Sequence, residues 1–430
     1  MASGRGSSRN IAVVTLGNLS APAVALITAP ILANGLGAVG RGEVAAATAP
    51  LMLCVAGLTV GMPEALTYFV ARMRAISTGT VIRALIVSAV AGGFGSLAIA
   101  LLAMVLADGD RQLATLISLC ALGVVPALIT GCCRGIARGR QKWRLVVAEQ
   151  LVGAATRLIG LAGLLTLDML TPATAAAVLT LGTFTGVLPY LALLKRENTE
   201  PTRVPSGELV RFGLTIWPGA VAGVLLSRID QALFLPLSTA AALGVYAVAV
   251  SLSDVSRVFN AAVRDVIFAR ESAATDDTSL GTASRLSTLI TAFMSIVVAI
   301  GVAVLAVPLF GQDFAEVPLV VVILLAGVIV GNPGSVVGAG VAARGRALLR
   351  SLAICIGVVL NVVLLLILAP PYGAVGAACA AAIANAVTGQ TVLLLSRRVI
   401  RVPARDLLFP RRGDLSLLVT MARGLLRRGR

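Results

Sequence analysis

The sequence contains no histidine, and this absence excludes several kinds of chemistry. Histidine is the side chain that changes charge near neutral pH, and it is the commonest metal ligand. A histidine metal site, a histidine proton relay and a Ser-His-Asp or Cys-His catalytic arrangement are therefore excluded. Lysine is nearly absent too. Neither Lys142 nor Lys195 stands in a GxxxxGK[ST] motif, which excludes ATP hydrolysis at a site of that type.

Cysteine is scarce and has no metal-binding spacing. No CxxC pair is present, and all six cysteines lie within or at the ends of apolar segments: Cys54, Cys120, Cys132, Cys133, Cys355 and Cys379. This placement indicates small, buried, apolar side chains. We therefore predict neither a metal site nor a cofactor.

Charged residues make up only 13% of the chain and aromatic residues 4%, whereas hydrophobic residues make up 58%. The mean hydropathy of +0.98 lies far above that of soluble domains. These values predict an all-α polytopic membrane protein. The net charge is +16, which in a soluble protein suggests a nucleic-acid partner. In a membrane protein the positions of the cations matter more than their number, and no nucleic-acid partner is predicted.

Twelve apolar runs are long enough to cross a bilayer as helices. The first six cover residues 11–36, 43–70, 80–107, 112–132, 145–167 and 173–194. The second six cover residues 212–237, 240–266, 286–310, 315–340, 350–369 and 373–396. The start of the chain is basic but shows no convincing cleavage site, so we expect the first run to be a retained helix.

The loops between these runs differ sharply in charge. Of the lysines and arginines, 31 fall on one side of the predicted membrane, and only Arg41 and Arg111 fall in loops on the other. Basic loops face the cytoplasm in most membrane proteins. The pattern predicts a multi-pass protein of the plasma membrane with both termini in the cytoplasm.

The two halves of the chain share an internal repeat. Residues 137–140 read Ala-Arg-Gly-Arg and recur as residues 343–346, with an offset of 206 residues and after the fourth run of each half. Six spans per half give both copies the same orientation, so the repeat predicts two six-helix lobes related by a parallel pseudo-twofold axis. The alternative is coincidence in a chain rich in alanine and arginine.

The predicted organisation is an N-terminal lobe at residues 1–198, a linker at 199–211, a C-terminal lobe at 212–398 and a basic tail at 399–430. In the tail, the apolar residues Leu418, Met421 and Leu425 fall on one helical face with arginines around them. This pattern predicts an amphipathic helix on the anionic inner leaflet. A frayed basic tail is the alternative.

Arg157 is the deepest cation in the predicted topology, about twelve residues into the fifth span. A charge at this depth is costly, so it should face the bundle interior or a wet cavity. A guanidinium group forms bidentate hydrogen bonds with phosphate, which favours a role in substrate binding. The alternative is a structural pair with Glu149, with Asp230 or with backbone carbonyls.

Arg228 and Asp230 interrupt the seventh span. They lie about 200° apart around a helix, so each needs a partner on another element. We interpret Arg228 as a substrate-binding residue. For Asp230, a structural anchor and a proton-coupling site are both consistent with the sequence.

A polar stripe in the eighth span is formed by Asp254, Arg257, Asn260, Arg264 and Asp265 within an arc of about 140°. We expect it to line a vestibule open to the cytoplasm, with Arg257, Asn260 and Arg264 as substrate ligands and Asp254 as a coupling group. A helix that extends into the cytoplasm is the alternative.

A further candidate for coupling is Glu64, which follows Gly61-Met62-Pro63 and should stand just past a kink in the second span. The alternative is a helix-start carboxylate that interacts with freed backbone amides.

Several short runs resemble the polysaccharide transporters, the Wzx-type oligosaccharide flippases of the multidrug/oligosaccharidyl-lipid/polysaccharide exporter superfamily. These runs are Gly40–Glu43, Gly61–Arg72, Arg228–Gln231 and Leu243–Ala247. The resemblance implies alternating access by two lobes around a central cavity. It also implies movement of an undecaprenyl-pyrophosphate-linked sugar to the outer face, driven by an ion gradient. At the position after Gly-x-Pro, where the family commonly has glutamine, this chain has Glu64.

The expected partners are therefore a lipid-linked sugar, membrane lipids and polysaccharide assembly proteins. A drug/cation antiporter of the same superfamily is the second interpretation, although it should have more carboxylates and aromatic residues in its cavity. A membrane glycosyltransferase or polymerase would need a sizeable outer loop for its chemistry, and every predicted outer loop is short. We therefore expect the chain not to be an enzyme.

Overall fold

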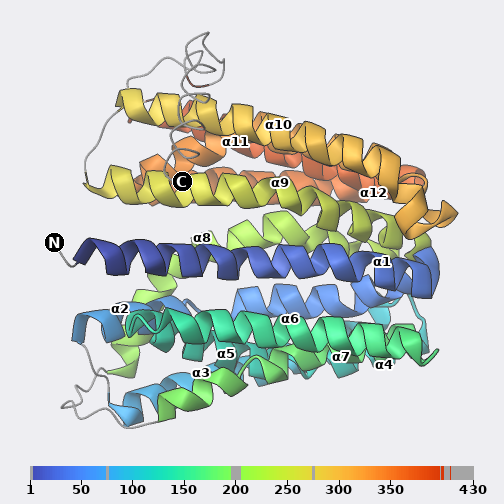
Figure 1. Cartoon of the computed structure of the whole chain (residues 1–430), viewed down its shortest axis with the longest axis horizontal. Coiled ribbons are helices and arrows are strands. Elements are labelled where there is room, and N and C mark those ends of the chain that lie inside the picture. Colours follow the sequence, from blue (N-terminus) through green and yellow to red (C-terminus); the bar gives the residue numbers. More distant parts are fainter. Residues whose placement is uncertain are drawn as a thin grey trace. The chain divides into compact units, whose positions relative to one another are not determined.

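The computed structural model describes residues 3–73, 77–194, 205–273, 277–397, 399–400 and 407, and this part of the chain is almost entirely helical (Figure 1). The chain divides into two compact units. Unit 1 comprises Met1–Ser251 with Val307–Glu316, and unit 2 comprises Leu252–Ala306 with Val317–Arg430. Most of the predicted C-terminal tail lies outside the described residues, so its amphipathic helix stays a prediction.

Unit 1 contains most of the helices. In chain order they are α1 (Ser3–Leu58), α2 (Met62–Met73), α3 (Thr78–Leu106), α4 (Arg111–Ala121), α5 (Val124–Gly139), α6 (Trp143–Thr166), α7 (Pro172–Thr185), η1 (Leu188–Leu194), α8 (Ser206–Leu233), η2 (Leu235–Leu237), the start of α9 (Ala240–Ala273) and η3 (Gln312–Phe314). The segment around η3 is tied to α1, because the Asn34 side chain donates a hydrogen bond of 2.6 Å to the Leu309 carbonyl.

Unit 2 contains the rest of α9, most of α10 (Asp277–Phe310), α11 (Val317–Val341), the short π-helix η4 (Ala342–Arg346) and α12 (Ala347–Ser396). α11 and α12 pack with their backbones in close contact. A Cβ atom built on Gly334 would lie 2.0 Å from the Gly389 carbonyl oxygen, and one built on Gly331 would lie 2.6 Å from the Asn385 carbonyl oxygen. Small residues allow this close approach of membrane helices.

The long helices break where the sequence predicts the ends of spans. Gly37 and Gly373 have φ of +66° and +53° and divide α1 and α12 into two segments each, and Gly345 has φ of +80° between α11 and α12. By length and hydropathy, seven stretches of the described residues are able to cross a membrane, or eight with a bent pair in α8. One of these stretches, residues 312–396, contains three predicted spans. With the glycine breaks included, the described helices fit the predicted twelve-span arrangement.

Three helices of unit 1 end with a non-glycine residue in the left-handed region: Asp108, Gln141 and Asp168. In each case the next residue donates its N–H to a carbonyl five residues earlier, for example Lys142 to Ala137 at 2.8 Å. This bond satisfies a carbonyl that the helix end would otherwise leave free. Each of the three turns therefore closes the end of its helix with a hydrogen bond from its own backbone.

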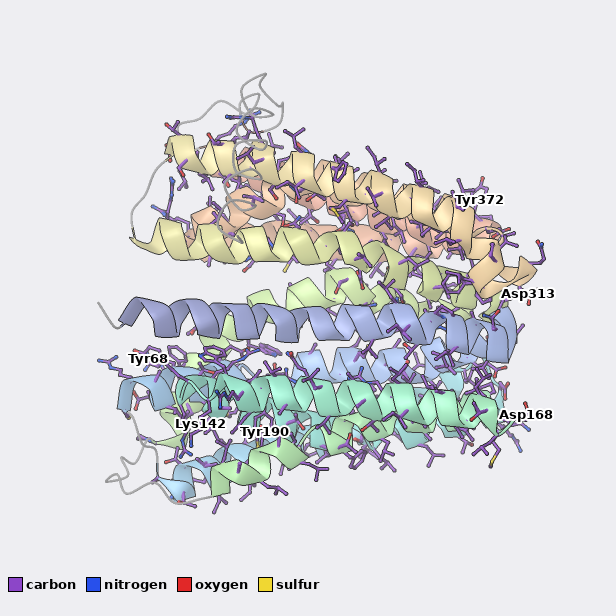
Figure 2. The ribbon with its side chains drawn as sticks, in the orientation of Figure 1. Tyr68, Lys142, Asp168, Tyr190, Asp313 and Tyr372 are labelled. Atoms are coloured by element: carbon purple, nitrogen blue, oxygen red, sulfur yellow. The ribbon has the colours of Figure 1, made fainter. Side chains whose placement is uncertain are left out.

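Charge is distributed unevenly along unit 1. Figure 2 shows Tyr68, Lys142 and Tyr190 toward one end of this unit, and Asp168 and Asp313 toward the opposite end. The two ends agree with the sorting of basic and acidic loops in the sequence. We refer to them as the basic end and the acidic end. The prediction that the basic end faces the cytoplasm remains a prediction.

The two units do not coincide with the two predicted lobes. Helix α8 and the start of α9 belong by sequence to the second half of the chain, yet they pack within unit 1. Near the acidic end, a Cβ atom on Gly42 would lie 1.7 Å from the Ala240 carbonyl oxygen, and one on Gly244 would lie 2.0 Å from the Ala38 carbonyl oxygen. These glycines bring α1 and α9 into direct backbone contact. The lobe boundaries drawn from the repeat stay a prediction.

Candidate functional site

The second span is broken ahead of Glu64, as its sequence predicts. Val60 and Gly61 have φ of +47° and +64°, and α2 starts at Met62. The carbonyls freed by the break have side-chain partners, because Thr59 Oγ1 donates to Ala56 at 3.1 Å and Trp217 Nε1 donates to Gly57 at 2.8 Å. The hydrogen bond from Trp217 of α8 therefore stabilises the break.

Glu64 lies in the first turn of α2 and is exposed. Its charge acts on Arg138 near the end of α5, although the two side chains do not form an ion pair. A carboxylate is favourable at a helix N-terminus because the freed N–H groups carry partial positive charge. This agrees with the helix-start interpretation, and the role of Glu64 in coupling stays a prediction.

Asp230 is buried in unit 1, with only 3% of its surface exposed. Tyr246 of α9 donates its hydroxyl to the Asp230 carboxylate, and the Gln231 N–H donates to the same carboxylate at 2.8 Å. The Tyr246 ring also stacks on Phe234, with centroids 5.6 Å apart. Asp230 therefore connects α8 to α9, which agrees with the structural-anchor alternative, and its role in coupling stays a prediction.

We expect Tyr246→Phe to lower the free energy of unfolding by about 2 kcal/mol, because a buried carboxylate loses a hydrogen-bond donor. Titration of the purified protein with denaturant in detergent measures the change. Tyr372→Phe is the matched control, because Tyr372 is 64% exposed. If Tyr246→Phe left stability unchanged and Asp230→Asn abolished only gradient-driven transport, Asp230 would be a coupling group and not an anchor.

Arg157 lies between α6 and α7. Its Nε donates to the Gly153 carbonyl at 3.0 Å, and the guanidinium covers Gly182 of α7, where a Cβ atom would lie 3.1 Å from the Arg157 Nε. Of the partners considered from the sequence, a backbone carbonyl is the one found. The side chain is half-buried and forms no ion pair within the part of the chain that the structure describes.

Glu149 is not available to Arg157 because other side chains hold it. Arg134 of α5 donates from Nε at 2.9 Å and from Nη2 at 2.5 Å, and the Tyr190 hydroxyl donates at 2.6 Å. Bidentate pairing of arginine with a carboxylate is among the strongest hydrogen-bonded arrangements in proteins. Sequence analysis did not identify this cluster. The one feature of the sequence that could have indicated it is that Arg134 and Glu149 lie only 15 residues apart, on either side of the turn between α5 and α6.

The polar stripe of the eighth span divides within unit 2. Asp254 and Arg257 form a loose ion pair, with 3.8 Å between Arg257 Nε and Asp254 Oδ1. Both side chains are partly exposed, Asp254 at 28% and Arg257 at 30%. Asn260 is buried and donates to Asn332 of α11, which in turn donates to Thr288 at 2.9 Å, while Arg264 donates to Ser335 at 3.1 Å. Asn260 and Arg264 therefore connect α9 to α11, and the prediction that they line a vestibule and bind substrate stays a prediction. The Asp265 side chain lies outside the described residues.

A residue that sequence analysis assigned to a loop is part of the bundle. Arg41 lies in the second segment of α1, just after the break at Gly37, and its Nε is buried. The positive charge of Arg228 of α8 lies within electrostatic range of Arg41. The sequence places Arg41 in a loop, because it stands between two apolar runs, and so it does not indicate that Arg41 is part of a helix.

The described residues contain no cluster of three or more acidic or cysteine side chains placed to hold a metal ion. Arginines 41, 157 and 228 lie on helices α1, α6 and α8 of unit 1.

The sequence profile of the family described as "Polysaccharide biosynthesis protein" matches residues 7–270 of the chain. None of the curated proteins matches the sequence.

Solved structures with the same fold are transporters. A multidrug resistance MATE family transporter of the MOP superfamily, in an inward-facing conformation, has a TM-score of 0.72 and 15% identity, covering 90% of this chain and 98% of that one. The lipid II flippase MurJ has a TM-score of 0.60 and 17% identity, covering 90% and 89%. A MOP superfamily transporter from Pyrococcus furiosus, described as having a binding pocket of reverse polarity, has a TM-score of 0.52 and 15% identity, covering 91% and 96%. At these identities the likeness concerns the fold.

Proposed function

Because the chain belongs to the polysaccharide biosynthesis protein family, we propose that it is a flippase for a lipid-linked oligosaccharide. The substrate class is a sugar unit on a polyprenyl pyrophosphate such as undecaprenyl pyrophosphate, moved from the cytoplasmic to the outer face by alternating access. An ion gradient drives the cycle, and both chain termini face the cytoplasm. The similarity in fold to MurJ, a lipid II flippase, supports this proposal.

One observation carries the proposal: the buried carboxylates in the spans of unit 1 are occupied, whereas a cation is left without an acidic partner. Asp230 is held by Tyr246, and Glu149 is held by Arg134 and Tyr190. Among the residues that the structure describes, Arg157 donates only to the Gly153 backbone carbonyl. The charge left to attract a ligand is therefore positive, which suits a pyrophosphate group.

A drug/cation antiporter is the second candidate, and Glu64 is the observation that favours it. This carboxylate is exposed at a broken span, where it is able to meet a cationic ligand. The arginines in the same unit oppose such a ligand by electrostatic repulsion. For this reason we rank the antiporter below the flippase.

Reconstitution of the protein into vesicles with a fluorescent polyprenyl-pyrophosphate sugar tests the proposal. We expect the wild-type protein to expose the labelled sugar on the opposite leaflet and Arg157→Ala to slow this step at least about tenfold, because removal of a charged partner costs about 1.5 to 3 kcal/mol. Quenching of the fluorophore from outside measures the rate. Arg111→Ala is the matched control, because Arg111 is exposed at the start of α4.

The proposal fails if vesicles with wild-type protein move the labelled lipid no faster than empty vesicles. Exchange of a cationic dye for protons by the same vesicles would instead identify the antiporter. Loss of transport in Glu64→Gln without any effect of Arg157→Ala would point to the same conclusion.

A further inference from the structure

The basic end of unit 1 has a small aromatic cluster formed by α2 and α8. The rings of Tyr68 and Phe212 are stacked, with centroids 4.4 Å apart and 20° between their planes. Phe69 meets both rings edge to face, with its centroid 5.2 Å from that of Tyr68 and 5.7 Å from that of Phe212. Phe69 is buried in one apolar cluster with Met62 and Leu66, and Phe212 packs against this cluster. Packing from two helices therefore fixes the position of the Tyr68 ring.

Tyr68 keeps exposed surface although the rest of the cluster is packed. Phe212 covers one face of its ring, and Tyr68 as a whole is 38% exposed. Arg72 donates from Nη1 to the Tyr68 hydroxyl at 2.6 Å, while its guanidinium carbon lies 5.9 Å from the ring centroid. This distance is at the outer limit of a cation–π contact, so the guanidinium lies toward the hydroxyl end of the ring. The ring face opposite Phe212 is therefore available to a ligand.

Two polar side chains flank the exposed ring on the same helix. Glu64 lies four residues before Tyr68 and Arg72 lies four residues after it, so all three share one face of α2. All three residues are exposed. Their row extends about 12 Å along the helix axis. This face of α2 therefore presents a hydrogen-bond acceptor, a flat ring and a set of hydrogen-bond donors, one turn apart from each other.

We propose that Glu64, Tyr68 and Arg72 form a platform that binds a sugar ring of the transported substrate. A sugar ring has a face of C–H groups with partial positive charge, and this face packs against the negatively polarised face of an aromatic ring. Its hydroxyl groups both donate and accept hydrogen bonds, which suits a carboxylate on one side and a guanidinium on the other. The inference rests on the proposed function for the class of ligand, and it adds which residues contact the sugar.

A cationic aromatic ligand would also find a ring face at Tyr68, but the charge of Arg72 opposes it. Because the guanidinium is hydrogen-bonded to the Tyr68 hydroxyl, a cation on this ring would lie beside a fixed positive charge. An uncharged sugar meets no such repulsion. The platform therefore favours a sugar over a cationic drug.

The position of the platform gives it a stage in transport. Figure 2 shows Tyr68 toward the basic end of unit 1, the end that the proposed function assigns to the cytoplasm. A lipid-linked sugar that is moved outward is loaded from that side. The platform therefore acts when the substrate is loaded, and its loss should raise KM more than it lowers kcat.

Calorimetric binding to the full-length protein in detergent tests the platform. The probes are farnesyl pyrophosphate alone and farnesyl pyrophosphate that carries N-acetylglucosamine, glucose or galactose. We expect the wild-type protein to bind at least one sugar-bearing probe more tightly than the bare lipid, and Tyr68→Ala to reduce this preference about fivefold. Tyr68→Trp should keep the preference because it keeps a flat ring. Tyr372→Ala is the matched control, because Tyr372 is a 64% exposed tyrosine of unit 2.

The inference is overturned if the wild-type protein binds all four probes alike, or if Tyr68→Ala keeps the full preference for the sugar. Should Tyr68→Ala not fold, Tyr68→Leu keeps apolar contact with Phe212 without a flat ring and should lose the preference in the same way. Failure of the flippase proposal gives a different pattern, in which the sugar preference depends on Tyr68 but the vesicles do not move the labelled lipid. Transport with an unchanged KM in Tyr68→Ala would instead remove the platform and leave the flippase.

Discussion

Glu149→Ala is expected to lower the free energy of unfolding by about 3 kcal/mol, at the lower end of the cost of breaking a buried ion pair. The substitution removes the acceptor of two Arg134 hydrogen bonds and one from Tyr190. It also leaves Arg134 beside Arg138, whose charge already acts on it. The estimate is kept low because the Arg134 side chain is 37% exposed and water replaces part of the lost interaction.

Unfolding of the purified protein in a denaturing detergent measures this loss. Tyr190→Phe serves as the partial control and should cost about 1.5 kcal/mol, because only one hydrogen bond to the carboxylate is lost. A double-mutant cycle of Glu149 and Arg134 isolates the pair. If Glu149→Ala were as stable as the wild type, the cluster would not hold α5, α6 and η1 together, and its role would have to be sought in transport.

Gly61→Ala is expected to destabilise the protein by about 3 kcal/mol, from two separate causes. Gly61 has φ of +64°, which costs a residue with a side chain about 1 to 2 kcal/mol. In addition, a Cβ atom at this position would lie 2.2 Å from the Gly213 carbonyl oxygen, so α2 and α8 would have to move apart at a cost of about 1 to 3 kcal/mol.

Gly109→Ala separates the two causes. Gly109 also has positive φ, +84°, but a Cβ atom there meets nothing within 4 Å. This variant should therefore show only the backbone strain, about 1 kcal/mol. Thermal unfolding of both variants under the same conditions gives the comparison. Equal losses would mean that the contact between α2 and α8 contributes nothing to stability.

The contact at Gly61 also bears on the alternating access that we propose for this protein. Alternating access is usually described as one repeat rocking against the other. In this protein α8 and the start of α9 pack on the first half, through Gly61 and Gly213, Trp217 and Gly57, and Gly42 and Ala240. These helices belong to the second repeat by sequence and to unit 1 by packing.

The candidate site could be predicted only in part. Arg157 was identified from its depth and Arg228 from its interruption of an apolar run, and both criteria use the sequence alone. The sequence predicts a loop at Arg41, because it lies between two apolar runs, but the helix continues through this position. Asn260 and Arg264 are predicted to line a vestibule because their helical face is polar. A polar face also suits packing against Asn332 and Ser335, which lie about 70 residues away in the chain.

The sequence by itself determined the fold class, the number of spans and the separation of basic from acidic loops. These properties depend on the length of apolar runs and on where charges fall between them, and each is set locally. Only the tertiary structure decided the partners of the charges. The pairing of Tyr246 with Asp230 and of Arg134 with Glu149 depends on the rotation and depth of packed helices. The rotation and the depth of a helix cannot be derived from any single stretch of sequence, because every residue in the contact between two helices contributes to both.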